Sequence, residues 1–437
     1  MPDIPAGAQV FDLVFHPTHS TVYAGLLTGH IRAFAYDEQG QHKRTFSVRP
    51  SKRSCRALTI DADGSHLYAV GKSKALNIID TVTENVEIRA GAHDSPINRV
   101  KYLTPWLLST GDDDGVIKLW DPRQRECARK YTQHFDYITD FLWLEDKKQL
   151  VATSGDGTLS VMDIRSKKAE PFAQSEDQED ELLSIGAIKG ASKVVVGTQI
   201  GILSIFNRSA GWGDCVDRIP GHPHSIDALC NVPADLPGVD ASSTILTGSS
   251  DGMVRAVKIL PTQLVGVVAD HGDWPVERIA IGGGTNQLTL DGRGGAGKSG
   301  STSGKKVDEA EVDHPPGRWW VGSVGHEEVI RLTDLEAFFH EAARDGSDGA
   351  GGLALDEDQR EVEDTDEEDG DNDTDSDLHL EEKLAARKIV EPEEDSDDED
   401  EAPKARKRKR KPEQTSLTVK KKGKNSVEVE PTFFDGL

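Results

Sequence analysis

Short runs of alternating hydrophobic and polar residues recur along the first three-quarters of the chain, with the two-residue period of a half-buried β-strand. In the run IKLWD (117–121), Ile117 and Leu119 share one face of the predicted strand, and Lys118 lies on the other. The pair Asp114-Gly115 separates this run from the preceding apolar run LLST, and Asp-Gly is a strong hairpin signal. The stretch 92–123 therefore predicts a small antiparallel sheet.

The end of this unit returns at a nearly constant interval. Steps of 43, 41, 42 and 44 residues separate five positions: Asp37, Asp80, Asp121, Asp163 and Asn207. A sixth repeat runs from Gly221-His222 to about Lys258, and a seventh begins near His271 and ends at Asp334. This period resembles that of the WD40 repeat, in which each unit forms one four-stranded blade. We predict an all-β fold, a seven-bladed WD40 β-propeller over residues 1–340.

The last repeat is interrupted and needs a closing strand. Residues 283–317 are rich in Gly, Ser and Lys and cannot bury apolar area, so they predict a disordered insertion in the last blade. The apolar segment Val10–Phe15 is expected to close the ring by pairing into that blade. After Asp334, Leu335, Phe338 and Phe339 recur at helical spacing, which predicts a short helix packed on the propeller.

The WD40 resemblance also implies a hydrogen-bonded set of side chains in the third repeat. The residues that match it by spacing are His93, Thr110, Asp114 and Trp120. A buried histidine and aspartate need satisfied partners, so we interpret the set as structural. The alternative, a catalytic His/Asp pair, lacks a nucleophile beside it in the sequence pattern.

Charge separates the repeats from residues 341–437, which we predict to be a disordered tail. The chain carries a net charge of −26. Residues 356–401 hold 25 acidic and 4 basic residues, whereas residues 402–437 hold 11 basic and 4 acidic ones. Blocks of like charge cannot offset the entropy cost of folding and often serve as interaction tails. Three residues in the acidic block have an acidic residue three positions on and are candidate phosphosites for an acidophilic kinase: Thr365, Thr374 and Ser396.

Within the basic stretch 404–424, the run KARKRKRK is typical of a nuclear localisation signal. Its charged residues are Lys404, Arg406, Lys407, Arg408, Lys409, Arg410 and Lys411. The alternatives are direct RNA contact, for which no interleaved aromatic residues offer stacking, and a solvated tail that balances the acidic block. No signal peptide or apolar run of membrane-spanning length is present, so we expect an intracellular protein.

The sequence offers little chemistry. Gly292–Ser299 matches the phosphate-binding pattern G-x-x-x-x-G-K-[ST], but no helix-forming sequence follows it, so we interpret the match as chance. The cysteines Cys55, Cys127, Cys215 and Cys230 lack metal-ligand spacing and are expected to be reduced. No hydrolase or kinase motif is present. We therefore expect no enzyme activity, cofactor or metal.

Two further features suggest contacts with partners. Arg123 and Arg165 each follow the repeat-closing aspartate by two residues, and similar WDxR motifs dock some WD40 proteins onto the adaptor of a cullin-type ubiquitin ligase. The alternative is that each arginine pairs with a local acidic group. At the C-terminus, Phe433 and Phe434 are apolar anchors of the kind that a groove on a partner captures.

Taken together, the strings VFDLVFHP, AHDSPINRVKYL, LLSTGDDDGVIKLWDPR and LVATSGDGTLSVMDIR resemble the WD repeat-containing protein 55 family, whose fungal members are known as Jip5. The resemblance implies a non-catalytic scaffold in the nucleus and nucleolus, active in ribosome biogenesis through rRNA processing. Its expected partners are proteins, namely pre-ribosome assembly factors, with weak or indirect RNA contact. The alternatives are a substrate receptor of a cullin-type ubiquitin ligase and a chromatin- or histone-binding propeller.

Overall fold

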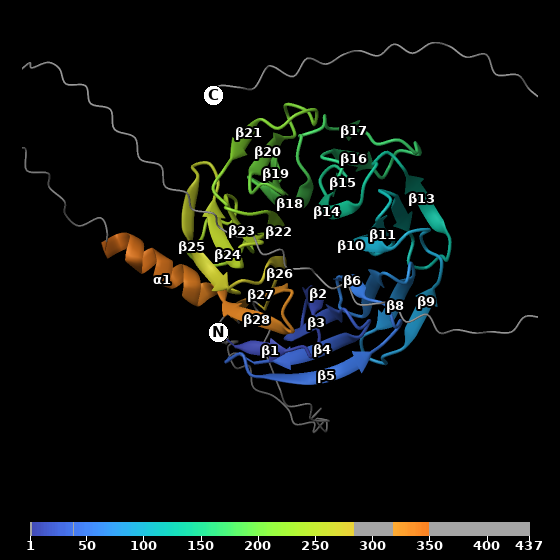
Figure 1. The fold of residues 1–437 in the computed structure, drawn as a ribbon, viewed down its shortest axis with the longest axis horizontal. Helices are drawn as coiled ribbons and strands as arrows, with labels where there is room; N and C mark the ends of the chain where they lie inside the picture. The colour runs from blue at the N-terminus through green and yellow to red at the C-terminus, as the bar shows by residue number, and fades with distance from the viewer. Residues whose placement is uncertain (1, 38, 284–317, 349–437) are drawn as a thin grey trace, which may run out of the picture. The chain divides into compact units, whose positions relative to one another are not determined.

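The chain closes into a ring of seven four-stranded antiparallel sheets, as the computed structural model shows (Figure 1). The structure describes residues 2–37, 39–283 and 318–348. The predicted seven-bladed β-propeller is confirmed, and every repeat boundary found in the sequence falls at the end of a blade's third strand or directly after it.

Each blade contributes one strand to each of four concentric positions. The inner strands are β2 (Val10–Phe15), β6 (Cys55–Ile60), β10 (Ile97–Thr104), β14 (Ile138–Leu144), β18 (Leu182–Ile188), β22 (Ile226–Asn231) and β26 (Val276–Gly283). The second strands are β3 (Thr21–Leu26), β7 (His66–Gly71), β11 (Leu107–Asp112), β15 (Gln149–Ser154), β19 (Lys193–Thr198), β23 (Thr244–Ser249) and β27 (Trp319–Gly325). The third strands are β4 (Ile31–Tyr36), β8 (Leu76–Asp80), β12 (Ile117–Trp120), β16 (Leu159–Asp163), β20 (Leu203–Asn207), β24 (Met253–Lys258) and β28 (Val329–Asp334). The outer strands are β5 (His42–Val48), β9 (Val86–Arg89), β13 (Cys127–Tyr131), β17 (Ala173–Gln174), β21 (Asp217–Ile219), β25 (Gln263–Asp270) and β1 (Asp3–Pro5).

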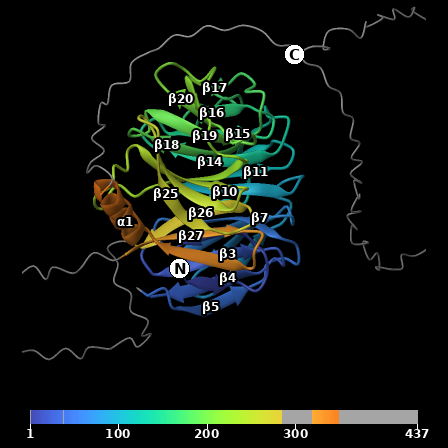
Figure 2. The same cartoon turned by 60° about the vertical axis from the view of Figure 1, so that its left-hand side comes forward.

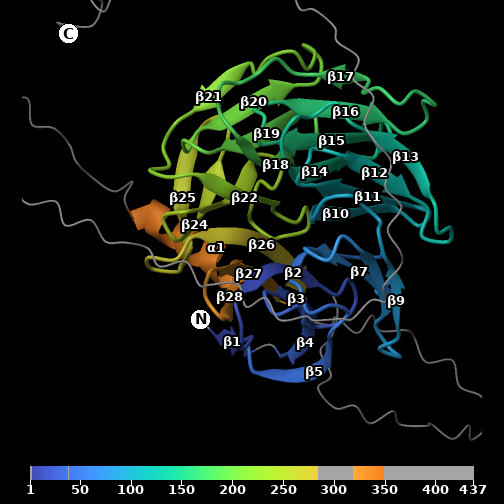
Figure 3. The same ribbon diagram turned by 45° about the vertical axis from the view of Figure 1, so that its right-hand side comes forward.

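Because neighbouring strands are antiparallel, the loops gather on two faces of the ring. We call upper the face whose loops join second to third strands and lead from each outer strand into the next blade. The lower face carries the loops that join inner to second strands and third to outer strands. Figure 3 shows β10, β14, β18 and β22 nearer the middle of the ring than β13, β17 and β21.

The strand that closes the ring is β1. Asp3, Ile4 and Pro5 pair with the third strand of the seventh blade, and the Ile4 side chain is fully buried. The prediction that Val10–Phe15 closes the ring is wrong, because that segment forms β2, the inner strand of the first blade. An inner strand packs against both neighbouring blades and therefore needs apolar residues on both faces. An outer strand needs only one buried side chain, which Ile4 provides.

The first blade packs closely against the seventh blade at two glycines. A Cβ atom on Gly282 would lie 2.2 Å from the Phe15 ring, and one on Gly322 would lie 2.6 Å from Leu13. The missing side chains therefore let β2 approach β26 and β27 closely. In this blade β26 pairs with β27 as far as Gly283, opposite Trp319, so the insertion begins where the pairing ends. The predicted disorder of residues 283–317 lies outside the described residues except at Gly283, which belongs to β26.

The predicted helix is confirmed as α1 (Leu335–Asp348), which follows β28 directly. Leu335 and Phe339 are buried in one apolar cluster with Val268 of β25. Figure 2 shows α1 lying along the outside of the ring beside β25. The helix therefore covers part of the outer edge of the sixth blade, an edge that would otherwise expose unpaired backbone groups.

Candidate interaction surfaces

The third blade contains a buried chain of side-chain hydrogen bonds. The indole N–H of Trp120 donates to Thr110 Oγ1 at 2.8 Å, and Thr110 Oγ1 lies 2.6 Å from His93 Nε2. The other nitrogen of the imidazole, His93 Nδ1, lies 2.7 Å from Asp112 Oδ2. Because a carboxylate only accepts, Nδ1–H donates to Asp112 and Nε2 accepts from the Thr110 hydroxyl. The chain ties the loop entering the blade to its second and third strands.

The carboxylate in this set of hydrogen bonds is Asp112, so the prediction that Asp114 belongs to the set is wrong. Asp112 is 1% exposed at the end of β11, and its Oδ1 also accepts the backbone N–H groups of Asp114 and Val116. Asp114 lies two residues further, at the exposed tip of the turn. The structure therefore brings together His93, Thr110 and Trp120 but leaves Asp114 outside.

The buried ring of His93 is held in the neutral form. Burial lowers its pKa, and the nearby Asp112 carboxylate only partly opposes that shift. A neutral imidazole has one N–H and one lone pair, which is what its two partners require. The chain of hydrogen bonds therefore depends on the neutral tautomer.

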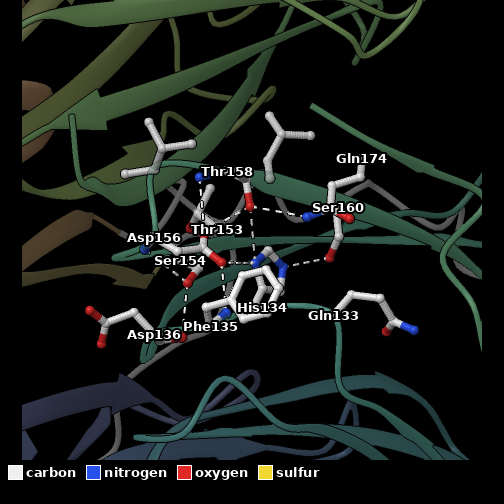
Figure 4. Close-up of polar contacts among 12 residues, drawn as sticks. Gln133, His134, Phe135, Asp136, Thr153, Ser154, Asp156, Thr158, Ser160 and Gln174 are labelled. Carbon is white, nitrogen blue, oxygen red and sulfur yellow. Dashed lines mark hydrogen bonds and ion pairs between the residues drawn. The ribbon is translucent and has the colours of Figure 1, made fainter. Parts of the chain in front are cut away.

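A related network in the fourth blade has the geometry of a Ser-His-Asp set (Figure 4). Ser160 Oγ lies 2.7 Å from His134 Nε2, and His134 Nδ1 lies 3.0 Å from Asp156 Oδ2. Asp156 also accepts the backbone N–H of Phe135 and the hydroxyl of Thr158. Burial by itself would raise the pKa of Asp156, but the hydrogen bonds from His134 and these two groups lower it well below the usual range.

This arrangement serves structure rather than nucleophilic chemistry. Ser160 is 1% exposed on β16, and its hydroxyl lies 3.4 Å from Met162 Sδ inside the blade. A serine nucleophile must reach a substrate carbonyl and needs donors for the developing oxyanion. The burial of Ser160 prevents such an approach.

The sixth blade contains a shorter version of this network, and the seventh blade contains a full one in which His271 Nδ1 lies 3.3 Å from Glu327 Oε2. His222 Nε2 lies 2.9 Å from Thr247 Oγ1, and His271 Nε2 lies 2.7 Å from Ser323 Oγ. Burial and the nearby Arg255 lower the pKa of His222 to about 4. Burial likewise lowers the pKa of His271.

Pattern analysis of the sequence missed the central mouth on the upper face. Every inner strand has a β-bulge after its first residue. The seven bulge residues line one cavity of about 380 Å³: Phe11, Arg56, Asn98, Thr139, Leu183, Asp227 and Glu277. Since bulges redirect side chains, the seven blades together turn one side chain each toward the mouth.

The charged groups at this mouth are paired. Arg56 Nη1 donates to Asp113 Oδ1 at 2.8 Å and to Asn98 Oδ1 at 2.5 Å. Asp227 accepts from the Ser250 hydroxyl at 2.6 Å, and burial raises the pKa of its carboxyl group. The mouth is thus a polar rim held in shape by its own hydrogen bonds.

One carboxyl group of the adjoining inner strand β2 is partly buried. Asp12 accepts the backbone N–H groups of Leu13 and Leu58, the second of these from the next blade. Burial raises its pKa to about 6, and Arg99 opposes the shift. Asp12 therefore links the first two blades through a hydrogen bond from one inner strand to the next.

The lower face carries the two arginines of the WDxR pattern. Arg123 and Arg165 each donate two hydrogen bonds to the aspartate two residues before them, at 2.7 and 2.9 Å in both cases. Their side chains are 70% and 62% exposed. The local pairing that we considered as the alternative is therefore present, and docking onto a ligase adaptor stays a prediction.

Several predicted features fall outside the described residues. They are the phosphate-loop match Gly292–Ser299, the candidate phosphosites Thr365, Thr374 and Ser396, the basic stretch 404–424 and the aromatic pair Phe433 and Phe434. Within the described ranges no helix is long and apolar enough to span a membrane, and no group of three or more His, Cys, Asp or Glu could hold a metal ion. The four cysteines are free thiols, of which Cys55 is buried.

Comparison with known proteins decides the family. The sequence model of the WDR55 family matches residues 1–289. The chain belongs to the WDR55 family. It is 65% identical over 372 residues to the WD repeat-containing protein JIP5 of Laccaria bicolor, covering 82% of this chain and 81% of that protein. It is 37% identical over 281 residues to WD repeat-containing protein 55 of Mus musculus, covering 64% of this chain and 70% of that protein.

The family resemblance suggested by the sequence is thus confirmed. The fungal relative in Coprinopsis cinerea, also named JIP5, is 63% identical over 341 residues, which cover 78% of this chain and 76% of that protein. In this WDR55 member, the histidine networks hold single blades together and the mouth residues come from all seven blades. The ring therefore offers binding faces, and its buried polar groups serve the fold.

Proposed function

We propose that this WDR55-family chain is a non-catalytic scaffold in nucleolar ribosome biogenesis that supports rRNA processing by binding other proteins. The observation that carries the scaffold role is the upper mouth, where each of the seven blades supplies one side chain, polar in five blades and apolar in two, to a single rim. A rim whose donors and acceptors are already paired is pre-organised, so binding a partner costs little ordering of side chains.

Exposed apolar side chains on the upper face add to this argument. Phe135 and Trp274 lie in loops that enter the fourth and seventh blades, and Leu27 and Ile200 lie in loops between second and third strands. Their exposed fractions are 91% for Phe135, 50% for Trp274, 48% for Leu27 and 63% for Ile200. Large apolar groups around a polar rim are typical of protein-binding surfaces.

The nucleolar part of the proposal rests on the sequence. The family resemblance implies ribosome biogenesis, and the basic run from Lys404 to Lys411 is typical of a nuclear import signal. The acidic block 356–401 would also suit a histone-binding propeller. For the ubiquitin-ligase alternative, Arg123 and Arg165 are already held by their own aspartates, which favours the scaffold.

The test is depletion of the protein in cells, followed by a gel of pre-ribosomal RNA intermediates. We expect precursors to accumulate, because a missing scaffold stalls the processing steps that it supports. The full-length chain should restore normal processing, and a chain ending before Lys404 should not.

A matched control separates the effect of nuclear import from the effect of protein binding by the propeller. The chain ending before Lys404 is fused to an unrelated nuclear import signal and should regain at least part of the rescue. Normal precursors after depletion would remove the ribosome proposal and leave the ligase-receptor and histone-binding functions as the ones to pursue.

A further inference from the structure

A large groove lies on the lower face, away from the mouth. It measures about 730 Å³ and is formed between the second and third blades. The loop after β6, the loop after β8 and strand β7 supply one wall, and Tyr102, Pro105 and the turn at Pro122 and Arg123 supply the other. Its volume falls within the range of about 300–1,000 Å³ that is typical of ligand sites.

Two stacked tyrosines form the inner part of the groove. The rings of Tyr68 and Tyr102 lie 6.3 Å apart with an interplanar angle of 22°. Tyr68 is only 4% exposed and lines the groove, and its hydroxyl is not one of the fully buried groups that lack a hydrogen-bond partner. A hydroxyl that lines a groove and is not sealed from solvent can form a hydrogen bond with a ligand that enters the groove.

The walls of the groove are negatively charged. They contain Asp61, Asp63, Asp80 and Glu87, against Arg123 and His66, and Glu87 is paired with Arg89 at 3.1 Å. Arg123 is already paired with Asp121, and His66 lies 3.1 Å from Asp61. Asp63 Oδ1 accepts two hydrogen bonds from Ser65, and the carboxyl group of Asp63 also lies in contact with the side chain of Asp61.

The tyrosine hydroxyl lies in the field of these carboxylates. Burial raises the pKa of Tyr68 far above its usual range, and the charges of Asp61 and Asp63 raise it further, whereas the charge of Arg89 opposes them. The phenol therefore stays protonated and neutral at physiological pH. An anion would be repelled here, whereas a cation would be attracted.

A second lower-face groove shows that the negative charge is specific to this position. The groove between the fourth and fifth blades, of about 560 Å³, also has aromatic residues, Phe172 and Trp212. Its charged lining has a small excess of positive charge, with Lys147, Arg165 and Arg208 opposing Asp146 and Asp163.

We propose that the groove between the second and third blades binds an arginine side chain of a partner protein's extended peptide. A guanidinium group is planar, donates five N–H groups and stacks on aromatic faces. It can thus bond to the Tyr68 hydroxyl and to the carboxyl group of Asp63 while its plane packs against Tyr102. Trp106, the neighbour of Pro105, is 59% exposed and offers an apolar contact for the peptide next to the groove. This inference does not depend on the proposed nucleolar role.

The probe is a fluorescently labelled peptide of alternating glycine and arginine, titrated against the purified full-length chain and followed by anisotropy. We expect an affinity on the order of micromolar, and a loss of about tenfold or more when citrulline replaces arginine, because citrulline keeps the shape but loses the charge. A lysine peptide should bind several-fold more weakly, because an ammonium group lacks the planar fork.

Substitutions in the groove test which residues bind. Tyr68→Phe removes only the hydroxyl and should weaken binding about three- to tenfold, as should Asp63→Asn. The matched control is Tyr23→Phe, because Tyr23 holds the same position in the first blade, is also 4% exposed and has its hydroxyl beside Thr81. Asp273→Asn on the upper face controls for net charge.

The outcomes are distinct. Thermal unfolding midpoints close to that of the natural chain establish that the variants fold. Absence of binding to the natural chain, equal binding of the citrulline peptide, or unchanged affinity in both Tyr68→Phe and Asp63→Asn would overturn the proposal. Equal binding of the lysine peptide would overturn its specificity for arginine.

Discussion

The carboxylate that holds the buried histidine changes place from one blade to the next. Asp114, Asp156 and Glu327 each lie seven residues before the end of their repeat, at Asp121, Asp163 and Asp334. Asp156 and Glu327 pair with the histidines of their blades, but Asp114 does not, because Asp112 is closer to His93. Spacing therefore identified the usual position of the acid, and could not show that a second acid two residues earlier would replace it.

A pair of matched substitutions tests this assignment. Asp112→Ala removes the acceptor for His93 Nδ1–H and for two backbone N–H groups, so we expect a loss of about 2–4 kcal/mol in the free energy of unfolding. Asp114→Ala at the exposed turn tip should change it by about 0.5 kcal/mol or less. Urea unfolding of both variants measures the difference, and equal losses would contradict the assignment.

A partly buried neutral histidine, His222, also predicts how stability depends on pH. The pKa of His222 is about 4 in the folded chain, against about 6.5 in an unfolded one. Between these values the unfolded chain binds the extra proton, so the free energy of unfolding falls as the pH falls from about 6.5 to 4. Each such histidine contributes up to about 1.4 kcal/mol per pH unit in that window.

The measurement is urea unfolding at a series of pH values from 7 to 5. The variant His222→Gln should show a shallower loss of stability on acidification than the natural chain. His224→Gln, at an exposed neighbour, is the control and should keep the original slope. If His222→Gln left the dependence of the free energy of unfolding on pH unchanged, His222 would not be the group whose protonation lowers the stability.

Strand β1 shows what alternation in a sequence can and cannot reveal. The seven-repeat period predicted the blades because six of them are built from consecutive stretches of chain. The three residues Asp3, Ile4 and Pro5 contain a single apolar side chain and a proline, so they carry no alternation from which a strand could be predicted. The six residues Val10–Phe15 do show such alternation, but alternation alone does not reveal which of the four positions in a blade a strand occupies.

Closure by this short strand predicts a large effect from a small change. Ile4→Ala removes a fully buried side chain from the seventh blade and should lower the free energy of unfolding by about 2–5 kcal/mol. The matched control is Ile88→Ala in the outer strand β9, where the side chain is 52% exposed. Thermal and urea unfolding compare the two, and similar effects would show that β1 does not hold the ring closed.

The ring creates surfaces that no local stretch of sequence contains. The residues of the upper mouth come from seven bulges, each about one repeat from the next, and include aromatic, apolar, hydroxyl, amide, acidic and basic side chains. No shared residue type marks them, so only the closed fold reveals that they meet. The lower groove likewise joins Tyr68 to Tyr102, two residues in neighbouring repeats whose proximity depends on how adjacent blades pack.

Ring closure by β1 also sets an order of events during synthesis. Ile4 leaves the ribosome before its partner Ile330, which follows 326 residues later. At about 5–20 residues per second, the N-terminal strand waits roughly 15–65 s for the strand that completes its sheet. A nascent or prematurely ended chain therefore presents an open seventh blade with an unpaired edge. That edge distinguishes it from the finished protein for any chaperone or protease that recognises exposed strands.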